Sequence, residues 1–169
     1  MTAALIGITV GFYIITLFSW SLNLAMLFYA PLAFAEPWRF VTAALLHSGM
    51  IHLFFNMYSL WLLGGSVEPA FGKWNFLGLY VFSAITGNLF AYGYAVLTGG
   101  MNLILVGASG AIFGLFGALL VLTRHINGNT TGILIVLGIN LLIGVTNPQI
   151  SWQAHIGGFI GVRFTLLYL

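Results

Sequence analysis

Two long stretches without a charged side chain constrain this sequence more than any other feature. One covers the first 35 residues, and the other runs from Trp74 to Thr123. A helix that crosses a bilayer needs about 20 mostly apolar residues, so these stretches alone have room for three or more such helices. Of the 169 residues only 4% are charged, whereas soluble domains carry roughly 25%. We therefore predict an all-α, polytopic membrane protein.

Breaks in the apolar pattern divide the chain into six expected transmembrane spans, which form one membrane domain over residues 1–169. The spans cover about residues 3–22, 50–70, 74–97, 108–123, 130–146 and 153–169. The connection over about residues 23–49 mixes prolines and charges with apolar residues, which is typical of short helices at the membrane interface. The N-terminus lacks the features of a cleaved signal, so its apolar run is expected to remain as a spanning helix.

The basic residues predict an orientation. Lys73 and Arg124 fall in the loops after the second and fourth spans, and these loops share a face with both termini. The positive-inside rule then places the termini in the cytoplasm, although Arg39 on the opposite face argues against this. We expect a multi-pass protein of a prokaryotic inner membrane. Arg163 in the sixth span is expected to reach toward the cytoplasmic headgroups.

Several kinds of chemistry are disfavoured. The chain has no cysteine, which excludes disulfides and a cysteine nucleophile, and its net charge of +2 is too small and scattered to indicate a nucleic-acid partner. His47 and His52 could bind a metal, but they are five positions apart and lie near no acidic residue. An H-E-x-x-H sequence is absent. We therefore expect no metal and no cofactor.

Polar groups inside a bilayer are costly, which makes Ser109 a candidate for function. It lies between Gly107 and Gly110, where a loop becomes the fourth span. Its backbone N–H has no partner within the helix, and the start of a helix favours negative charge. That environment suits an oxyanion. Close packing of small residues between membrane helices explains the same pattern without any chemistry.

His155 is expected about one turn into the sixth span, where a neutral imidazole needs a hydrogen-bond partner. It is either a structural histidine or a general base. Glycines four positions apart occur in the fourth and sixth spans, at Gly110 and Gly114 and at Gly157 and Gly161. Such faces allow close helix contact, and if they meet, Ser109 and His155 come within hydrogen-bond range. A serine nucleophile needs such a base.

The second span adds further polar groups at the same depth. His52 and Asn56 are four positions apart and project from one face, so both could donate to an oxyanion beside Ser109. His47 precedes them and is expected to orient the loop through a backbone hydrogen bond.

Three other polar residues are expected to be structural. Glu68 is expected to accept hydrogen bonds from the loop after the second span, and Arg39 with Trp38 to anchor the first loop at the membrane interface.

The sequence resembles the rhomboid family in four elements that occur in that family's order. They are Trp38-Arg39 with His47, His52 and Asn56; Gly64-Gly65-Ser66-Val67-Glu68; Gly107-Ala108-Ser109-Gly110; and Ala154-His155-Ile156-Gly157-Gly158. The resemblance implies a six-helix fold with a water-filled cavity open to the non-cytoplasmic face. It also implies cleavage of transmembrane protein substrates, among membrane lipids, by a Ser–His dyad that needs no carboxylate.

The same resemblance assigns roles to individual residues. Ser109 would be the nucleophile and His155 the general base and later the acid, while Asn56 and His52 would polarise the oxyanion. Phe113 matches a position where the family often has an aromatic ring packed on the catalytic histidine. Two other readings remain open, namely a rhomboid-like protein that binds transmembrane helices without cutting them and a small transporter. The fifth span, uncharged from Thr130 to Thr146, is a candidate lateral gate.

Overall fold

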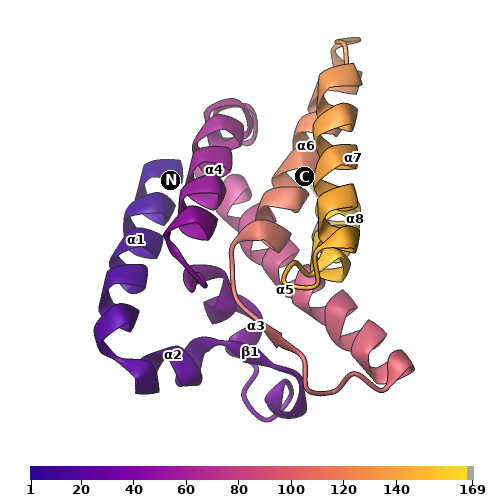
Figure 1. Ribbon diagram of the computed structural model, residues 1–169. Helices are drawn as coiled ribbons and strands as arrows, with labels where there is room; N and C mark the ends of the chain where they lie inside the picture. The colour runs from indigo at the N-terminus through magenta and orange to yellow at the C-terminus, as the bar shows by residue number, and fades with distance from the viewer. Residues whose placement is uncertain (167–169) are drawn as a thin grey trace.

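The computed structural model describes the backbone of residues 1–166 and the side chains of residues 1–162. They form a bundle of helices with a short two-stranded ribbon at one end (Figure 1). In chain order the elements are α1 Thr2–Phe18, α2 Trp20–Met26, β1 Phe28–Tyr29, the 3₁₀ turn η1 Ala30–Leu32, α3 Arg39–Thr42, the 3₁₀ turn η2 Ala43–Leu45, α4 Met50–Phe71, α5 Lys73–Thr98, β2 Ile104–Leu105, α6 Ser109–His125, α7 Thr131–Thr146 and α8 Trp152–Leu166.

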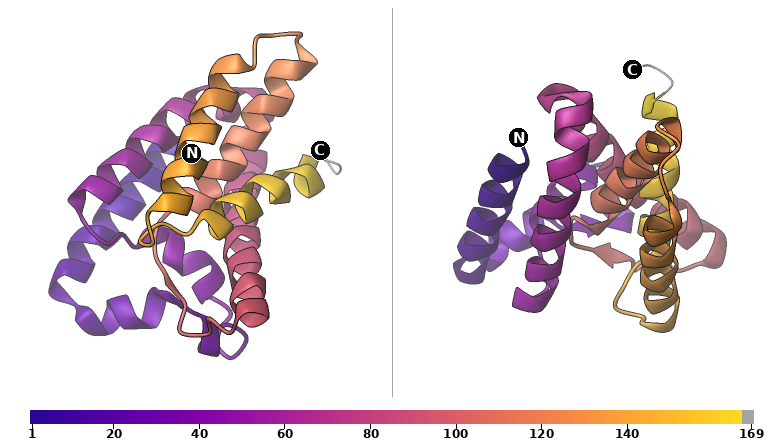
Figure 2. Two further views of the ribbon diagram at one scale, coloured as in Figure 1. Left: turned by 45° about the vertical axis from the view of Figure 1, so that its right-hand side comes forward. Right: turned by 90° about the horizontal axis from the view of Figure 1, so that it is seen from above.

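Helix α5 is the centre of the bundle, since it packs on α6 and α8 and also contacts α3 and α4. Helices α6 and α8 pack against each other, α1 packs on α4, and α7 makes only a few contacts with α6 and α8 (Figure 2). The main core lies between α1, α4, α5 and α6, where Leu60, Phe76, Leu79 and Leu115 are fully buried. Close packing of the middle helices therefore defines the region where the candidate site residues lie.

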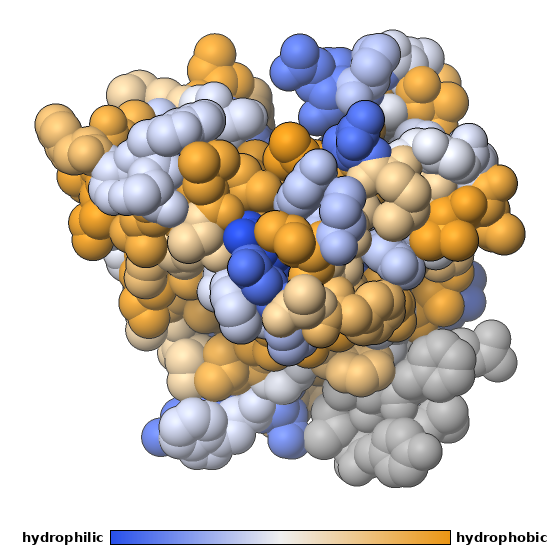
Figure 3. All heavy atoms as spheres, turned by 90° about the horizontal axis from the view of Figure 1, so that it is seen from below, coloured by the Kyte–Doolittle hydropathy of each residue, from blue (hydrophilic) through white to orange (hydrophobic). Residues whose placement is uncertain are grey.

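The outer surface of the bundle is largely apolar. Large side chains such as Phe54 and Trp61 on α4 and Leu142 on α7 are exposed, and the face seen from below shows broad hydrophobic areas with several smaller hydrophilic patches between them (Figure 3). Among the described residues, α4 and α5 are long and apolar enough to cross a membrane, while α1, α6 and α7 are shorter apolar helices. Exposed apolar surface of this extent is typical of an interaction with lipid.

The first apolar run is not one helix. The helix expected over residues 3–22 ends at Phe18, because Ser19 is extended with φ −133° and ψ 90°. The Ser19 hydroxyl accepts a hydrogen bond from the Leu22 N–H, so it caps the start of α2. A serine in this position satisfies a free N–H that the next helix would otherwise leave unpaired.

The first loop, defined here as residues 27–49, is fastened to the segment that leads into α6. Strands β1 and β2 pair antiparallel, with Phe28 opposite Leu105. The Gly107 N–H also donates to the Ala43 carbonyl at 2.9 Å. The sequence did not predict this two-stranded pairing, since each strand is only two residues long. Its effect is to hold the residues before Ser109 against the first loop.

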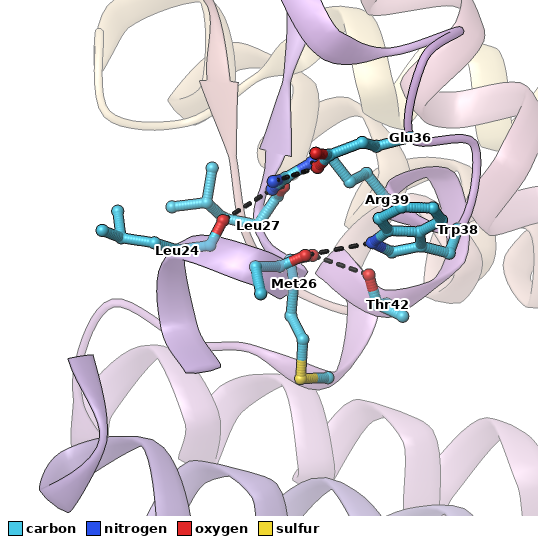
Figure 4. Close-up of polar contacts among 8 residues, drawn as sticks. Leu24, Met26, Leu27, Glu36, Trp38, Arg39 and Thr42 are labelled. Atoms are coloured by element: carbon cyan, nitrogen blue, oxygen red, sulfur yellow. Dashed lines mark hydrogen bonds and ion pairs between the residues drawn. The ribbon is translucent and has the colours of Figure 1, made fainter. Parts of the chain in front are cut away.

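Arg39 anchors the first loop from inside the protein rather than at the membrane interface. Its side chain is only 5% exposed and donates from Nη1 to the carbonyl oxygens of Leu24 (2.7 Å) and Leu27 (2.6 Å). Its guanidinium also forms an ion pair with Glu36. Figure 4 shows how these bonds tie α3 to the end of α2, together with bonds from Trp38 and Thr42 to the carbonyls of Ala25 and Met26.

Glu68 has a different partner from the expected one. Its Oε2 accepts hydrogen bonds from the backbone N–H and the hydroxyl of Thr2, both at 2.7 Å, and its carboxylate pairs with the amine of Met1. It therefore caps the start of α1 from the far end of α4, where a carboxylate is favoured by the helix dipole. The side chain of Arg163, expected to reach the headgroups, lies outside the described residues.

Candidate active site

Ser109 is the first residue of α6 and follows a turn that requires glycine. Gly107 has φ +124°, and a Cβ at this position would lie 2.7 Å from Cε1 of His52. A side chain would therefore be strained by the backbone and would collide with the imidazole. Because Ser109 begins the helix, its N–H is among those that have no intrahelical partner.

His155 lies in the first part of α8 and faces the start of α6. Its side chain is 5% exposed, and its ring stacks on Phe113 with centroids 4.1 Å apart and an interplanar angle of 11°. Phe113 follows Ser109 by four positions, so both lie on the same face of α6. Within residues 1–166 no hydrogen bond joins the Ser109 hydroxyl to His155, and Nδ1 of His155 has no partner.

Helices α6 and α8 meet through glycines, as expected, but through a different glycine of α8. A Cβ on Gly158 would lie 2.7 Å from the carbonyl carbon of Gly110. Gly157 and Gly161 instead face α5, where a Cβ would collide with Phe90 and Thr86 respectively. The expectation that the Gly157–Gly161 pair meets α6 was therefore wrong. Its glycines serve a second close contact, between α8 and α5.

His52 is held beside the turn before Ser109. Its Nδ1 is 3.0 Å from the Ser48 hydroxyl, and its Nε2 would lie 2.9 Å from a Cβ on Gly107. With Nδ1 turned to Ser48, the opposite ring nitrogen points toward the segment that leads into α6.

Asn56 lies one turn further along α4 and is buried. Its Nδ2 donates to the carbonyl of His52 at 2.9 Å, which uses one of its two N–H groups within the helix. The second N–H of the amide remains for another acceptor.

His47 packs on His52 just before α4 begins. The two rings meet edge to face with centroids 5.0 Å apart, and neither ring nitrogen of the buried His47 has a hydrogen-bond partner among the described residues. The backbone of Leu45, in the first loop, nevertheless interacts with the His47 ring and raises its pKa, so the hydrogen bond expected from His47 to the loop backbone stays a prediction. Burial, together with the neighbouring His52, lowers the pKa of His47 to about 4. The ring is neutral at pH 7 and supports His52 by contact.

The sequence analysis missed two residues at this site. Ser48, four positions before His52, could have been found from that spacing, which brings side chains together at the start of a helix. Asn88 of α5 donates to the carbonyl of Phe40 at 2.9 Å. No spacing in the sequence points to that contact, because it joins residues 48 positions apart. Within the described residues, no cluster of three His, Cys, Asp or Glu could hold a metal ion.

The chain is similar to known proteins over most of its length. The family model described as the Rhomboid domain matches residues 35–169. Rhomboid protease GluP of Bacillus subtilis is 36% identical over 138 residues, which cover 79% of this chain and 26% of the relative. Putative rhomboid protease YdcA of the same organism is 37% identical over 139 residues, which cover 79% of this chain and 67% of the relative.

The similarity also extends to a relative that is named as inactive. Inactive RHOMBOID-like protein 8 of Arabidopsis thaliana is 37% identical over 132 residues, which cover 74% of this chain and 36% of that protein. The chain thus spans about a quarter of GluP and about a third of the Arabidopsis protein. The family match covers well over half of the chain, and the all-α, polytopic membrane architecture agrees with it. The chain belongs to the rhomboid family of integral membrane proteins.

Proposed function

We propose that this chain is a serine endopeptidase that cleaves transmembrane segments of other proteins within the membrane. The observation that carries the proposal is the stacking of His155 on Phe113, one helical turn from Ser109. It brings the imidazole to the turn of α6 on which Ser109 lies. The names of the two Bacillus subtilis relatives as rhomboid proteases agree with this chemistry.

The proposed reaction is acyl transfer followed by hydrolysis. The Ser109 Oγ attacks the scissile carbonyl carbon while His155 takes the hydroxyl proton, and this step contributes about 10²–10⁴-fold to the rate. The carbon–nitrogen bond then breaks, and His155 returns the proton to the leaving amine. A water molecule, activated by the same imidazole, hydrolyses the acyl-enzyme and regenerates Ser109. The hydrogen bond from the Ser109 hydroxyl to His155 would form when substrate binds, since catalytic hydrogen bonds often tighten only in the substrate complex.

The oxyanion would be stabilised by three donors that surround the start of α6. They are the backbone N–H of Ser109, the second amide N–H of Asn56 and the Nε2–H of His52. With Ser48 donating to Nδ1, the proton of the neutral His52 ring is on Nε2, the nitrogen nearest to Gly107. Removal of one donor of this type costs on the order of 10²–10³-fold in turnover.

Substrate entry beside α7 is supported by how lightly this helix is packed. Among the described residues of α7, only Gly144 is buried. A pocket of about 180 Å³ lies between α7, Phe113 of α6, and Ile156 and Phe159 of α8. A transmembrane substrate that displaces α7 would therefore disrupt few contacts and would reach the ring that supports His155.

We further propose that the termini are cytoplasmic and that the site opens toward the outer face. Lys73 and Arg124 support this orientation through the positive-inside rule, and the ion pair with Glu36 neutralises the buried Arg39, which otherwise argues against it. Because the chain has no cysteine, single cysteines at Asn127 and Asn102 would report the two faces separately. We expect a membrane-impermeant thiol reagent, added to intact cells, to label position 102 and not position 127. The reverse labelling would refute the orientation.

The deciding experiment is cleavage of a model transmembrane substrate in liposomes. The intact chain is compared with Ser109→Ala and His155→Ala, and the exposed Ser66→Ala and His125→Ala serve as matched controls. We expect cleavage by the intact chain and both controls and none by the two site variants. Cleavage that survives Ser109→Ala would refute the mechanism. No cleavage by any folded form would favour the alternative that the chain binds transmembrane helices without cutting them, as the inactive relative makes conceivable.

A further inference from the structure

One face of α5 packs on the first loop and carries a single amide among apolar side chains. Ile85 and Tyr92 belong to this face, three positions before and four positions after Asn88. They pack on an apolar cluster of the loop that includes Phe28 and Phe40. Asn88 is 9% exposed, and its Nδ2 donates to the Phe40 carbonyl at 2.9 Å. A buried amide in such surroundings is costly unless it is hydrogen-bonded, so its partner is specific.

The residue before Asn88 lies at the junction of α6 and α8. A Cβ on Gly87 would be 2.8 Å from the Ala154 carbonyl oxygen and 3.4 Å from the Gly110 Cα. Ala154 precedes His155, and Gly110 follows Ser109. Gly87 therefore contacts the two helices that carry the proposed dyad, and the next residue, Asn88, contacts the first loop.

A short path leads from the Asn88 hydrogen bond to Ser109. Phe40 and Ala43 belong to the adjoining elements α3 and η2, and the Ala43 carbonyl accepts the Gly107 N–H at 2.9 Å. Gly107 is the glycine with positive φ in the turn that begins α6, two positions before Ser109. Asn88 thus binds the loop segment at Phe40, and the same segment binds the turn through Ala43.

We propose that Asn88 is a positioning residue, which locks the first loop onto α5 and thereby fixes the turn from Gly107 to Ser109. The hydrogen bond from Asn88 to the first loop is a property of the fold. Only its expected effect on catalysis rests on the proposed function. Asn88 donates to a loop carbonyl and acts on the reaction only through that loop. Its role is to keep the Ser109 N–H directed at the oxyanion.

The proposal predicts a loss in turnover rather than in substrate binding. Asn88→Leu has a similar volume but leaves the Phe40 carbonyl without this donor, so the loop and the attached turn are free to shift. A displacement of about 1 Å at a reacting group costs up to roughly 10²-fold in rate. We expect kcat for a transmembrane substrate to fall by about 10- to 100-fold with KM little changed. Asn75→Leu is the matched control, because Asn75 lies exposed on the same helix.

A second variant keeps the test decisive if Asn88→Leu does not fold. In Asn88→Asp a neutral carboxylic acid can donate to the Phe40 carbonyl, whereas an ionised carboxylate would face that carbonyl and repel it. The ratio of kcat in Asn88→Asp to kcat in the unaltered protein should therefore fall as the pH rises. A ratio that does not change with pH would argue against a donated hydrogen bond.

Hydrogen exchange separates this inference from the proposed protease activity. It is measured on the amides of residues 103–107 with Ser109→Ala as the common background. Faster exchange with Asn88→Leu than with Asn75→Leu would support the attachment of the first loop to α5 through Asn88. If the chain also cleaved no substrate, only the proposed function would fail. Equal exchange in the two variants, or faster exchange with unchanged kcat, would overturn the positioning role.

Discussion

The contact between Gly158 and Gly110 permits a quantitative test of how closely α6 and α8 must approach. A Cβ added to Gly158 would overlap the carbonyl oxygen of Gly110, its nearest neighbour, and would lie 2.7 Å from the carbonyl carbon and 3.2 Å from the Cα of Gly110. Ordinary contacts of a Cβ begin at 3.4 Å, and the obstacle is backbone, which cannot rotate away. Gly158→Ala therefore requires the two helices to separate by more than about 0.7 Å, because that value restores contact only with the carbonyl carbon and the carbonyl oxygen lies closer still.

This separation has two expected consequences. Overpacking in a close contact costs about 1–3 kcal/mol, so the midpoint of thermal unfolding in detergent should fall. The same shift moves His155 away from Ser109, and a displacement approaching 1 Å costs on the order of 10²-fold in rate. We therefore expect kcat for a transmembrane substrate to fall by about 10- to 100-fold in Gly158→Ala.

The matched control for this substitution is Gly78→Ala on α5, where nothing lies within 4 Å of the added Cβ. An alanine there is expected to be neutral or to stabilise the helix by up to about 1 kcal/mol. The measurements are the thermal midpoint by tryptophan fluorescence and the initial rate of substrate cleavage. If Gly158→Ala matched Gly78→Ala in both, the argument that the α6–α8 approach positions the dyad would be refuted.

Three further predictions concern single side chains. Glu68→Gln weakens the cap of α1 and should lower the free energy of unfolding by about 1 kcal/mol in a thermal melt, with cleavage retained. The folded protein protonates His47 only near pH 4, whereas the unfolded chain does so near 6.5. The unfolded state therefore gains protons first, and stability that is complete above pH 6.5 should fall by up to about 3 kcal/mol as the pH is lowered to 4. His47→Gln should reduce this dependence in melts across that range. Phe113→Ala should reduce cleavage several-fold because His155 loses its stacked ring, and Phe113→Tyr should retain it; equal rates in both would contradict a role for the ring.

Much of the helix pattern could be predicted from the sequence because apolar runs and breaks have a direct physical meaning. The run from Trp74 and the polar turn at Arg124 delimit α5 and α6 closely, since charged residues are costly within the bilayer and tend to mark the ends of a spanning helix. The prediction of an all-α, polytopic membrane protein of the rhomboid family is confirmed. The division at Ser19 was missed, because a lone serine in an apolar run is compatible with a continuous helix until tertiary contacts favour its capping geometry.

The candidate site likewise combines residues that could be predicted from the sequence with contacts that could not. The candidate residues could be predicted from the sequence, because Ser109, His155, His52 and Asn56 are polar groups that a membrane helix carries only at a cost. The contacts around these residues could not be predicted from the sequence. Gly158 rather than Gly157 approaches α6, Glu68 caps α1, and Asn88 holds a carbonyl 48 positions away. These contacts depend on how whole helices rotate and cross, which is set by the packing of the entire bundle and not by local spacing.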